Sequence, residues 1–316
     1  MKIIGSAPGK LILFGEHASS RNRPAIVFAV NKRLKATLTK HTDKQKNILL
    51  SSRELGIKDA IYPDEQFDLV SKAIEIFLKK TNCSKERILI SFESEIESGF
   101  GSSAAVIAST LGVLNEYYRT NLSNVELLEL GLDANFAIKG YGSGLDIAAA
   151  VYGGMIKYQI GKEPIQLPYK HLNLVIGNTG IKAISGPIVK SVKMFENKNP
   201  HDAFEIFNSM ERIVIQAENL LKNYKVNNLG VLMDKNQELL QKLNVSSPKL
   251  EEMITAAKKS GALGAKLSGA GIGDNMIVLT TKSKRTKIIK ALNQTSGKAL
   301  PDIEIDPNGL VVDIEE

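Results

Sequence analysis

Cysteine and tryptophan are almost absent from this chain of 316 residues, which holds one cysteine, Cys83, and no tryptophan. A single cysteine cannot form a disulfide within the chain, so the disulfide-stabilised secreted scaffolds are excluded and a reducing compartment is favoured. No run of about 18 apolar residues occurs, and a membrane-spanning helix needs one. The apolar run at the N-terminus is broken by Pro8 and Gly9, unlike a secretory signal. We therefore expect a cytoplasmic protein with no membrane partner.

Neither the basic nor the acidic residues are concentrated in one part of the chain. The net charge is +7, from 41 Lys and Arg against 34 Asp and Glu. The densest basic run, at residues 282–287, has no aromatic residue between its cations, so the sequence does not favour a nucleic-acid partner. A broadly basic chain suits an anionic small-molecule substrate, although charge alone does not name one.

Strand-like and helix-like segments are mixed along the chain without steady alternation, and this predicts an α+β fold. Apolar residues recur with a helical period over residues 65–80 and 121–139, with Ser123 as the N-cap of the second segment. Short β-rich runs at residues 11–14, 25–30, 34–40 and 87–93 predict strands. A polar stretch with two prolines at residues 161–168 is the expected junction between a domain of residues 1–165 and one of 166–316.

A glycine-rich loop in the middle of the chain is its most informative feature. Gly99 and Gly101 let the backbone approach a ligand closely, and a helix expected from Ser103 directs unpaired N–H groups at it. This arrangement favours phosphate binding, although a structural turn before a helix has the same pattern. The candidate phosphate-binding residues are Glu97, Ser98, Gly99, Phe100, Gly101, Ser102, Ser103 and Ala104.

Two common phosphate motifs do not fit this chain. The segment Gly5-Ser-Ala-Pro-Gly-Lys-Leu11 has three residues between its glycines, where the P-loop needs four. Gly99-x-Gly-x-x-Ala104 nearly matches the dinucleotide fingerprint, but the region near residue 120 has no acidic residue for a ribose.

Further motifs at both ends of the chain indicate a family. They are Gly9-Lys-Leu-Ile-Leu-Phe-Gly-Glu-His17, Ser143-Gly-Leu-Asp-Ile-Ala-Ala-Ala-Val-Tyr-Gly-Gly154, Leu232-Met-Asp-Lys-Asn-Gln-Glu-Leu-Leu240 and Gly261-Ala-Leu-Gly-Ala-Lys-Leu-Ser-Gly-Ala-Gly271. With the middle loop, this set resembles the motifs of the superfamily of galactokinase, homoserine kinase, mevalonate kinase and phosphomevalonate kinase (GHMP kinases). The details are most similar to those of the mevalonate kinases, and the resemblance covers nearly the whole chain.

The resemblance implies a two-domain α+β fold with the active site in the cleft between the domains, the second domain having a ferredoxin-like sheet with helices. It also implies ATP-dependent phosphorylation of mevalonate to 5-phosphomevalonate in isoprenoid biosynthesis, with ATP and Mg²⁺ as cofactors.

The resemblance also assigns roles to residues. Asp146 lies beside the attacking hydroxyl, with Lys10 as its partner, and these two are the candidate catalytic residues; the alternative for an acid in the apolar run Leu145–Val151 is a helix N-cap. Ser103 and Asn135 are the candidate metal ligands. Substrate contacts fall to Glu16, His17, Ser143, Gly144 and Ser185, and the last phosphate loop comprises Ser268, Gly269, Ala270 and Gly271.

Three departures from the family pattern leave alternatives open. Gly-Glu-His is followed by Ala18-Ser-Ser-Arg-Asn-Arg23, the usual metal-binding Glu is replaced by Asn135, and the third loop continues into Gly-Ile-Gly-Asp274. The last of these is closer to the phosphomevalonate kinases, for which Arg21, Arg23 and Lys182 would serve a phosphorylated acceptor. A nucleotide-binding regulator without catalysis is the alternative from another class. Whether the protein forms a homodimer is left open.

Overall fold

The computed structural model describes residues 1–43 and 47–315. The chain forms two compact units. Unit 1 comprises Met1–Lys10, Ala29–Gly154 and Asp306–Glu316, and unit 2 comprises Leu11–Phe28 and Met155–Ile305. The units interleave along the chain, whereas the sequence analysis expects a single boundary at residue 165; that boundary stays a prediction.

The sheet of unit 1 has the strand order β12-β1-β2-β5-β3-β4. Strand β12 runs antiparallel to β1, with Lys2 opposite Glu315, while β3 and β5 are parallel. Strands β1 and β2 both continue into unit 2, where β2 pairs with β6 and β6 with β7. The strands are β1 (Lys2–Phe14), β2 (Ala25–Lys40), β3 (Ile48–Ser52), β4 (Ile57–Ile61), β5 (Ile88–Ser94), β6 (Met155–Tyr158), β7 (Ile165–Leu167) and β12 (Val311–Glu315).

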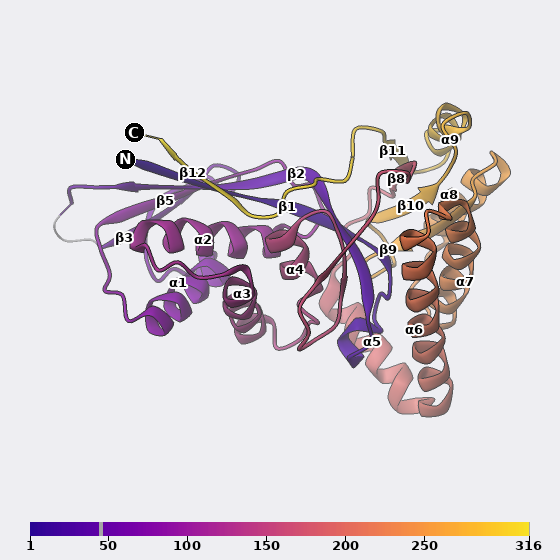
Figure 1. Cartoon of the computed structure of the whole chain (residues 1–316), viewed down its shortest axis with the longest axis horizontal. Helices are drawn as coiled ribbons and strands as arrows, with labels where there is room; N and C mark the ends of the chain where they lie inside the picture. Colours follow the sequence, from indigo (N-terminus) through magenta and orange to yellow (C-terminus); the bar gives the residue numbers. More distant parts are fainter. Residues whose placement is uncertain (44–46, 316) are drawn as a thin grey trace. The chain divides into compact units, whose positions relative to one another are not determined.

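Helices cover one face of the unit 1 sheet (Figure 1). They are α1 (Asp68–Thr81), α2 (Ser102–Tyr118), α3 (Asn124–Lys139) and α4 (Leu145–Tyr152). The expected N-cap of α3 is confirmed, since Ser123 and Glu126 form a reciprocal capping box. Helix α2 is apolar on most of its surface and lies at the centre of this layer, so its N-terminus is held firmly in place.

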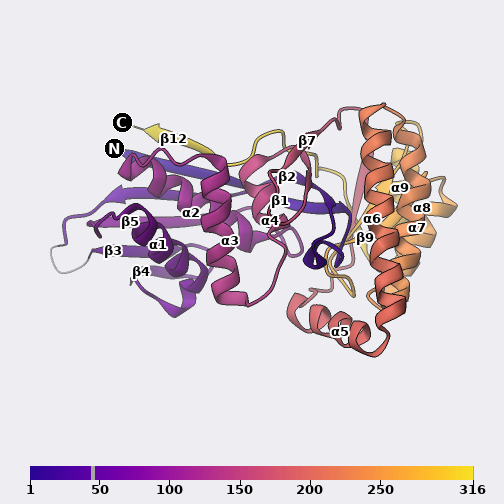
Figure 2. The same ribbon diagram turned by 60° about the horizontal axis from the view of Figure 1, so that its bottom comes forward.

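Unit 2 contains a sheet of order β11-β8-β10-β9 that is antiparallel throughout. Its apolar core lies between this sheet and the helices, of which α6, α7 and α8 lie side by side in Figure 2. The strands are β8 (Leu174–Asn178), β9 (Gly264–Ser268), β10 (Asn275–Leu279) and β11 (Lys298–Leu300). The helices are α5 (Ser185–Lys198), α6 (Pro200–Lys222), α7 (Leu229–Lys242), α8 (Pro248–Lys259) and α9 (Arg285–Leu292).

The α+β class is confirmed, and the differences from the sequence analysis concern strands. The short strand expected at residues 11–14 is the end of the longer β1, whose first half contains Gly5, Pro8 and Gly9, residues that disfavour a strand assignment. The two strands expected at residues 25–30 and 34–40 are one, β2. Strands β4, β7 and β11 were not expected. Within the described residues, no helix has the length and apolar content required to cross a bilayer.

Candidate active site

The middle glycine-rich loop of unit 1 ends at the N-terminus of α2. Gly99 and Gly101 have φ values of 86° and 82°, in the left-handed region that glycine tolerates. Helix α2 begins at Ser102, one residue before the expected start. Gly101 is its N-cap and offers no side-chain hydrogen bond, so the first N–H groups and the hydroxyls of Ser102 and Ser103 remain available to an anion.

Lys10 is held directly against this loop. Its backbone N–H donates to the carbonyl of Phe100 at 2.7 Å. A Cβ on Gly101 would lie 2.8 Å from Lys10 Cε, so the lysine side chain passes over the loop at van der Waals contact. The absence of a side chain at Gly101 therefore serves two purposes: it permits the left-handed turn, and it leaves room for Lys10.

Asp146 lies beside Lys10, as the sequence predicts. The distance from Lys10 Nζ to Asp146 Oδ1 is 3.6 Å; the lysine side chain is 8% exposed and that of the aspartate 46%. Asp146 does not cap α4, since the N-cap is Gly144, with φ 77°, and Asp146 itself lies in the first turn of the helix. The structural alternative for Asp146 is thus excluded, and its carboxylate is accessible to a small molecule. Ser143 Oγ accepts a bond from the N–H of Leu145 at 3.4 Å.

Lys139 is a neighbour of this pair that sequence analysis missed. It is the last residue of α3, partly buried, and burial lowers its pKa, with Asp146 opposing and Lys10 reinforcing the shift. Asn135 is one helical turn earlier and partly buried. A lysine at a helix C-terminus usually only complements the helix dipole, so its position in the sequence did not indicate that it lies near Asp146 and Lys10.

A cavity of about 260 Å³ adjoins the N-terminus of α2 in unit 1. Ser102 and Ser103 lie on its wall, together with the rings of Phe67 and Phe92. Carboxylates and an amide complete the lining, so the cavity has apolar walls and several hydrogen-bonding groups. Such a lining is typical of small-molecule sites. The lining residues are Leu34, Ser52, Glu54, Leu55, Gln66, Phe67, Asp68, Leu69, Val70, Phe92, Ser94, Ser102, Ser103 and Val106.

Glu16, in unit 2, is buried rather than open to solvent. It is 1% exposed; Oε1 forms an ion pair with Lys266, and Oε2 accepts a bond from Asn236 Nδ2 at 3.2 Å. Burial raises the pKa of Glu16 and lowers that of Lys266, and each charge opposes the other's shift. Both carboxylate oxygens thus have partners within unit 2. A direct contact between Glu16 and substrate stays a prediction, and the geometry favours a supporting role.

His17 follows in an unusual backbone conformation. Its φ is 61°, in the left-handed region, which costs a residue other than glycine about 1–3 kcal/mol, although His adopts it more often than most residues do. Its Nε2 lies 3.0 Å from the carbonyl oxygen of Ala270, in the last glycine-rich loop. Burial lowers the pKa of His17 to about 4, with a smaller contribution from Arg21. The imidazole is therefore neutral at physiological pH.

The last loop, residues 268–271, continues from β9. Gly269 and Gly271 have φ values of 98° and 91°, and a Cβ on Gly271 would overlap the carbonyl oxygen of Val245. Gly269 has open space around it, which leaves its backbone accessible. Phosphate binding by this loop stays a prediction.

The remaining predicted residues of unit 2 are on its surface or already paired. Ser185 and Lys182 are exposed. Arg21 forms an ion pair with Glu196 at 3.2 Å and lies over the ring of Phe207, and Arg23 pairs with Glu211 at 3.2 Å.

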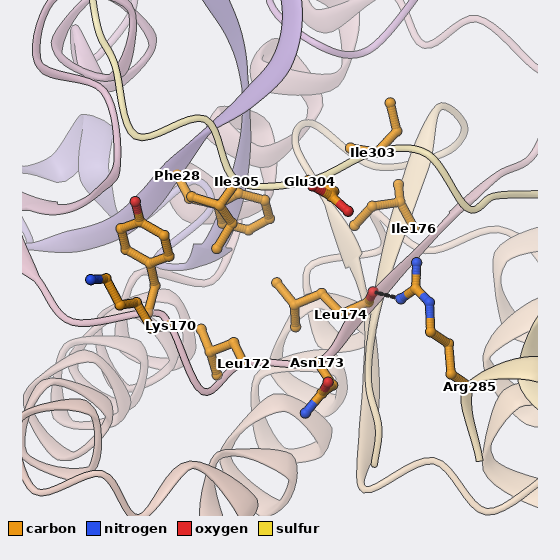
Figure 3. Close-up of a pocket in the computed structure, with 11 residues that line it drawn as sticks. Phe28, Lys170, Leu172, Asn173, Leu174, Ile176, Arg285, Ile303, Glu304 and Ile305 are labelled. Atoms are coloured by element: carbon orange, nitrogen blue, oxygen red, sulfur yellow. Dashed lines mark hydrogen bonds between the residues drawn. The ribbon is translucent and has the colours of Figure 1, made fainter. Parts of the chain in front are cut away.

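Another cavity, of about 360 Å³, lies in unit 2, and none of the motif residues described above lines it (Figure 3). Arg285 is its most prominent cation. Its guanidinium donates to the carbonyl oxygens of Leu174 and Pro301, so it fastens backbone segments together. The chemistry described above uses none of the residues that line this cavity.

A metal ion bound near the N-terminus of α2 would have few ligands from the protein. Mg²⁺ binds oxygen atoms and keeps several waters, with much of its coordination supplied by phosphates. Ser103 and the Asn135 amide offer neutral oxygens, and Asp146 offers a carboxylate. Across the described part of the chain, no cluster of three His, Cys, Asp or Glu could hold a metal alone. The residues present therefore fit a cation that arrives bound to a nucleotide.

Comparison with known proteins identifies the family of the chain. The family model described as GHMP kinases N terminal domain matches residues 68–154, and the GHMP kinases C terminal model matches residues 218–298. A mevalonate kinase of Thermococcus gammatolerans is 31% identical, covering 99% of each chain. The chain belongs to the GHMP kinase family.

Solved structures place the fold of this GHMP kinase among its relatives. The Lin0012 protein of Listeria innocua has a TM-score of 0.90 at 22% identity and covers 99% of each chain, which shows the shared fold. A mevalonate kinase of L. major, solved in complex with R-mevalonate, has a TM-score of 0.75 at 26% identity, covering 95% of this chain and 94% of that one.

The lowered pKa of His17 makes the stability of this GHMP kinase depend on pH. In the unfolded chain His17 takes up a proton near its ordinary pKa of 6.5, whereas the folded protein resists it until about pH 4. His17 therefore lowers the free energy of unfolding as pH falls from 6.5 to 4, by about 3 kcal/mol in all. Above pH 6.5 it has no such effect.

We expect His17→Asn to remove this slope, because Asn tolerates the left-handed backbone and does not titrate. Urea unfolding at a series of pH values measures it, with the exposed His201→Gln as the control. Equal acid sensitivity in the wild type and His17→Asn would contradict the assignment.

Proposed function

We propose that this GHMP kinase transfers the γ-phosphoryl group of ATP to the 5-hydroxyl of mevalonate. The observation that carries the proposal is the Lys10–Asp146 pair, 3.6 Å apart, with Lys10 lying against the loop that opens α2. A half-exposed carboxylate beside a buried ammonium and a phosphate-binding helix N-terminus provides what phosphoryl transfer to an alcohol requires. The mevalonate kinase relatives support the choice of acceptor.

In the proposed reaction, Asp146 accepts a hydrogen bond from the 5-hydroxyl and takes its proton as the oxygen attacks the γ-phosphorus. The bond from that phosphorus to the bridging oxygen of ADP breaks, and ADP leaves with the electron pair. Lys10 stabilises the negative charge on the transferring group. Because Lys10 Nζ also lies 3.6 Å from Asp146 Oδ1, the same ammonium is close to both the carboxylate that takes the proton and the group that is transferred.

Nucleotide binding in this proposal uses two features of unit 1. The N–H groups at the start of α2 bind phosphate oxygens. The cavity with Phe67 and Phe92 in its wall takes the base, whose amino group suits the carboxylates on its rim.

When bound with the nucleotide, Mg²⁺ supplies positive charge that neutralises the phosphate oxygens. Ser103 and Asn135 are the residues that would hold it, through neutral oxygen atoms. Lys139 is a further amine close to Asp146 and Lys10, and burial lowers its pKa.

An unphosphorylated acceptor fits the charges of unit 2 better than a phosphorylated one. Lys182 is exposed, whereas Arg21 and Arg23, the other two cations that would serve a second phosphate, are each paired with a glutamate of unit 2. Their charge is thus largely compensated. Neutral His17 donates from Nε2 to the carbonyl of Ala270, so its Nδ1 is a hydrogen-bond acceptor, which suits a hydroxyl of a small acid.

ADP release measured with a panel of acceptors tests the proposal. We expect turnover with mevalonate and little with 5-phosphomevalonate or 3-phosphomevalonate. Activity confined to a phosphorylated acceptor would overturn the assignment of substrate. ATP binding without turnover on any of the three would point to a regulator built on a kinase fold.

Asp146→Asn should lower kcat by about 10²- to 10⁴-fold, because the amide cannot accept the proton. The KM for ATP should change little, since the phosphates bind to the loop. Steady-state kinetics at saturating mevalonate measure both values, with Asp133→Asn, exposed on α3, as the matched control. A fall of about tenfold or less would mean that Asp146 only orients the acceptor.

Asn135→Glu should shift half-maximal activity to lower free Mg²⁺, because a carboxylate adds charge to a neutral ligand set. Ser103→Ala should shift it to higher free Mg²⁺. Titration of free Mg²⁺ at constant MgATP measures the midpoint. An unchanged midpoint in Asn135→Glu would show that residue 135 does not face the metal.

A further inference from the structure

Lys266 belongs to the motif that precedes the last glycine-rich loop, yet it is wholly buried. It is 0% exposed, and its Nζ donates to Glu16 Oε1 and to the carbonyl oxygen of Leu267. Asn236, on α7, is also 0% exposed and donates to the other oxygen of Glu16. Two of its three N–H groups thus have partners within unit 2, and because the side chain is closed to solvent, the lysine is not placed to bind a phosphate from solution.

Strand β9 explains where this lysine points. Side chains alternate along a strand, and Ala265 and Leu267 pack into the core of unit 2. Lys266 and Ser268 therefore share the opposite face. Ser268 Oγ accepts from the N–H of Ile12 at 2.9 Å and donates to the carbonyl of Ile12 at 3.0 Å. This face of β9 thus holds the end of β1 and the residues that follow it.

The same contacts fix the residues predicted to meet the acceptor. Lys266 binds Glu16, the next residue is His17 in its left-handed conformation, and the His17 ring meets the carbonyl of Ala270. A strained backbone persists only where its surroundings determine it. Burying two charges costs several kcal/mol, which an apolar pair would avoid, so stability alone gives no reason for an ion pair here.

We propose that Lys266 is a positioning residue for the acceptor: through Glu16 it holds the backbone of residues 15–17 so that the His17 ring lies against Ala270. This inference rests on the proposed function for the identity of the acceptor. Lys266 thus positions other residues and does not bind phosphate, and Asn236 holds the second oxygen of Glu16.

The test replaces the pair by neutral residues of similar size, Glu16→Gln with Lys266→Met, because Lys266→Met alone would leave a buried carboxylate unpaired. The control replaces another ion pair of unit 2, Lys157–Glu218 (2.7 Å), by Lys157→Met with Glu218→Gln. The first readout is the pKa of His17 by NMR of the imidazole signals, which is practical because the chain has four histidines. The second is the KM for mevalonate against the KM for ATP.

We expect the pKa of His17 to rise from about 4 toward 6.5 in the Glu16→Gln, Lys266→Met variant, as the ring leaves its buried position. The KM for mevalonate should rise by about 3- to 10-fold, the equivalent of one lost hydrogen bond between neutral groups, with the KM for ATP within about twofold. The control should change neither.

An unchanged His17 titration and unchanged KM in the folded variant would overturn the inference. Should that variant fail to fold, Asn236→Ala takes its place with the same criteria, because it keeps the ion pair and removes only the bond to the second oxygen of Glu16. If the wild type does not phosphorylate mevalonate, the proposed function fails, while the His17 titration still decides whether Lys266 positions the ring.

Discussion

The Lys10–Asp146 ion pair is the interaction on which the account of this kinase depends. It joins the fifth-last residue of β1 to the first turn of α4. The Lys10 side chain passes over Gly101, where a Cβ would lie 2.8 Å from its Cε, and Gly101 is also the N-cap of α2. One small residue thus contacts both the lysine that pairs with Asp146 and the helix that is predicted to bind phosphate. A larger residue at 101 would disturb all three together, since it would strain the backbone and displace Lys10.

A second group of contacts is organised by strand β9, in unit 2. One face of β9 packs in the apolar core, and the other carries Lys266 and Ser268, which contact the segment of residues 12–17. The first glycine-rich motif therefore divides between the units, with Lys10 in unit 1 and Glu16 and His17 in unit 2. In the proposed reaction, the former serves phosphoryl transfer and the latter the acceptor.

Much of the fold was predictable because the patterns are local. Helices α1 and α3 follow from their apolar period, and the Ser123 cap from its own side chain. The first half of β1 was not, because Gly5, Pro8 and Gly9 disfavour strands unless neighbouring strands hold them. Asp146 and Lys10 were found through motifs, and the structure brings them together.

The residues that were missed depend on contacts between distant parts of the chain. Lys266 and Glu16 are 250 positions apart, so no local pattern reveals that the lysine is buried against the glutamate. Lys139 is inconspicuous at the end of its helix until α4 places Asp146 nearby. Phe67 and Phe92 come from different elements and meet only in the folded unit, where their ring centroids are 6.0 Å apart.

The position of the transferred phosphate tests the central claim most directly. Proton-coupled ³¹P NMR of the protein with MgATP and R-mevalonate follows the reaction without a coupling enzyme. The account predicts ADP signals and a new phosphomonoester signal split into a triplet by the two methylene protons at C5. An unsplit signal from phosphorylation of the tertiary hydroxyl, or ATP left intact beside the folded protein, would contradict it.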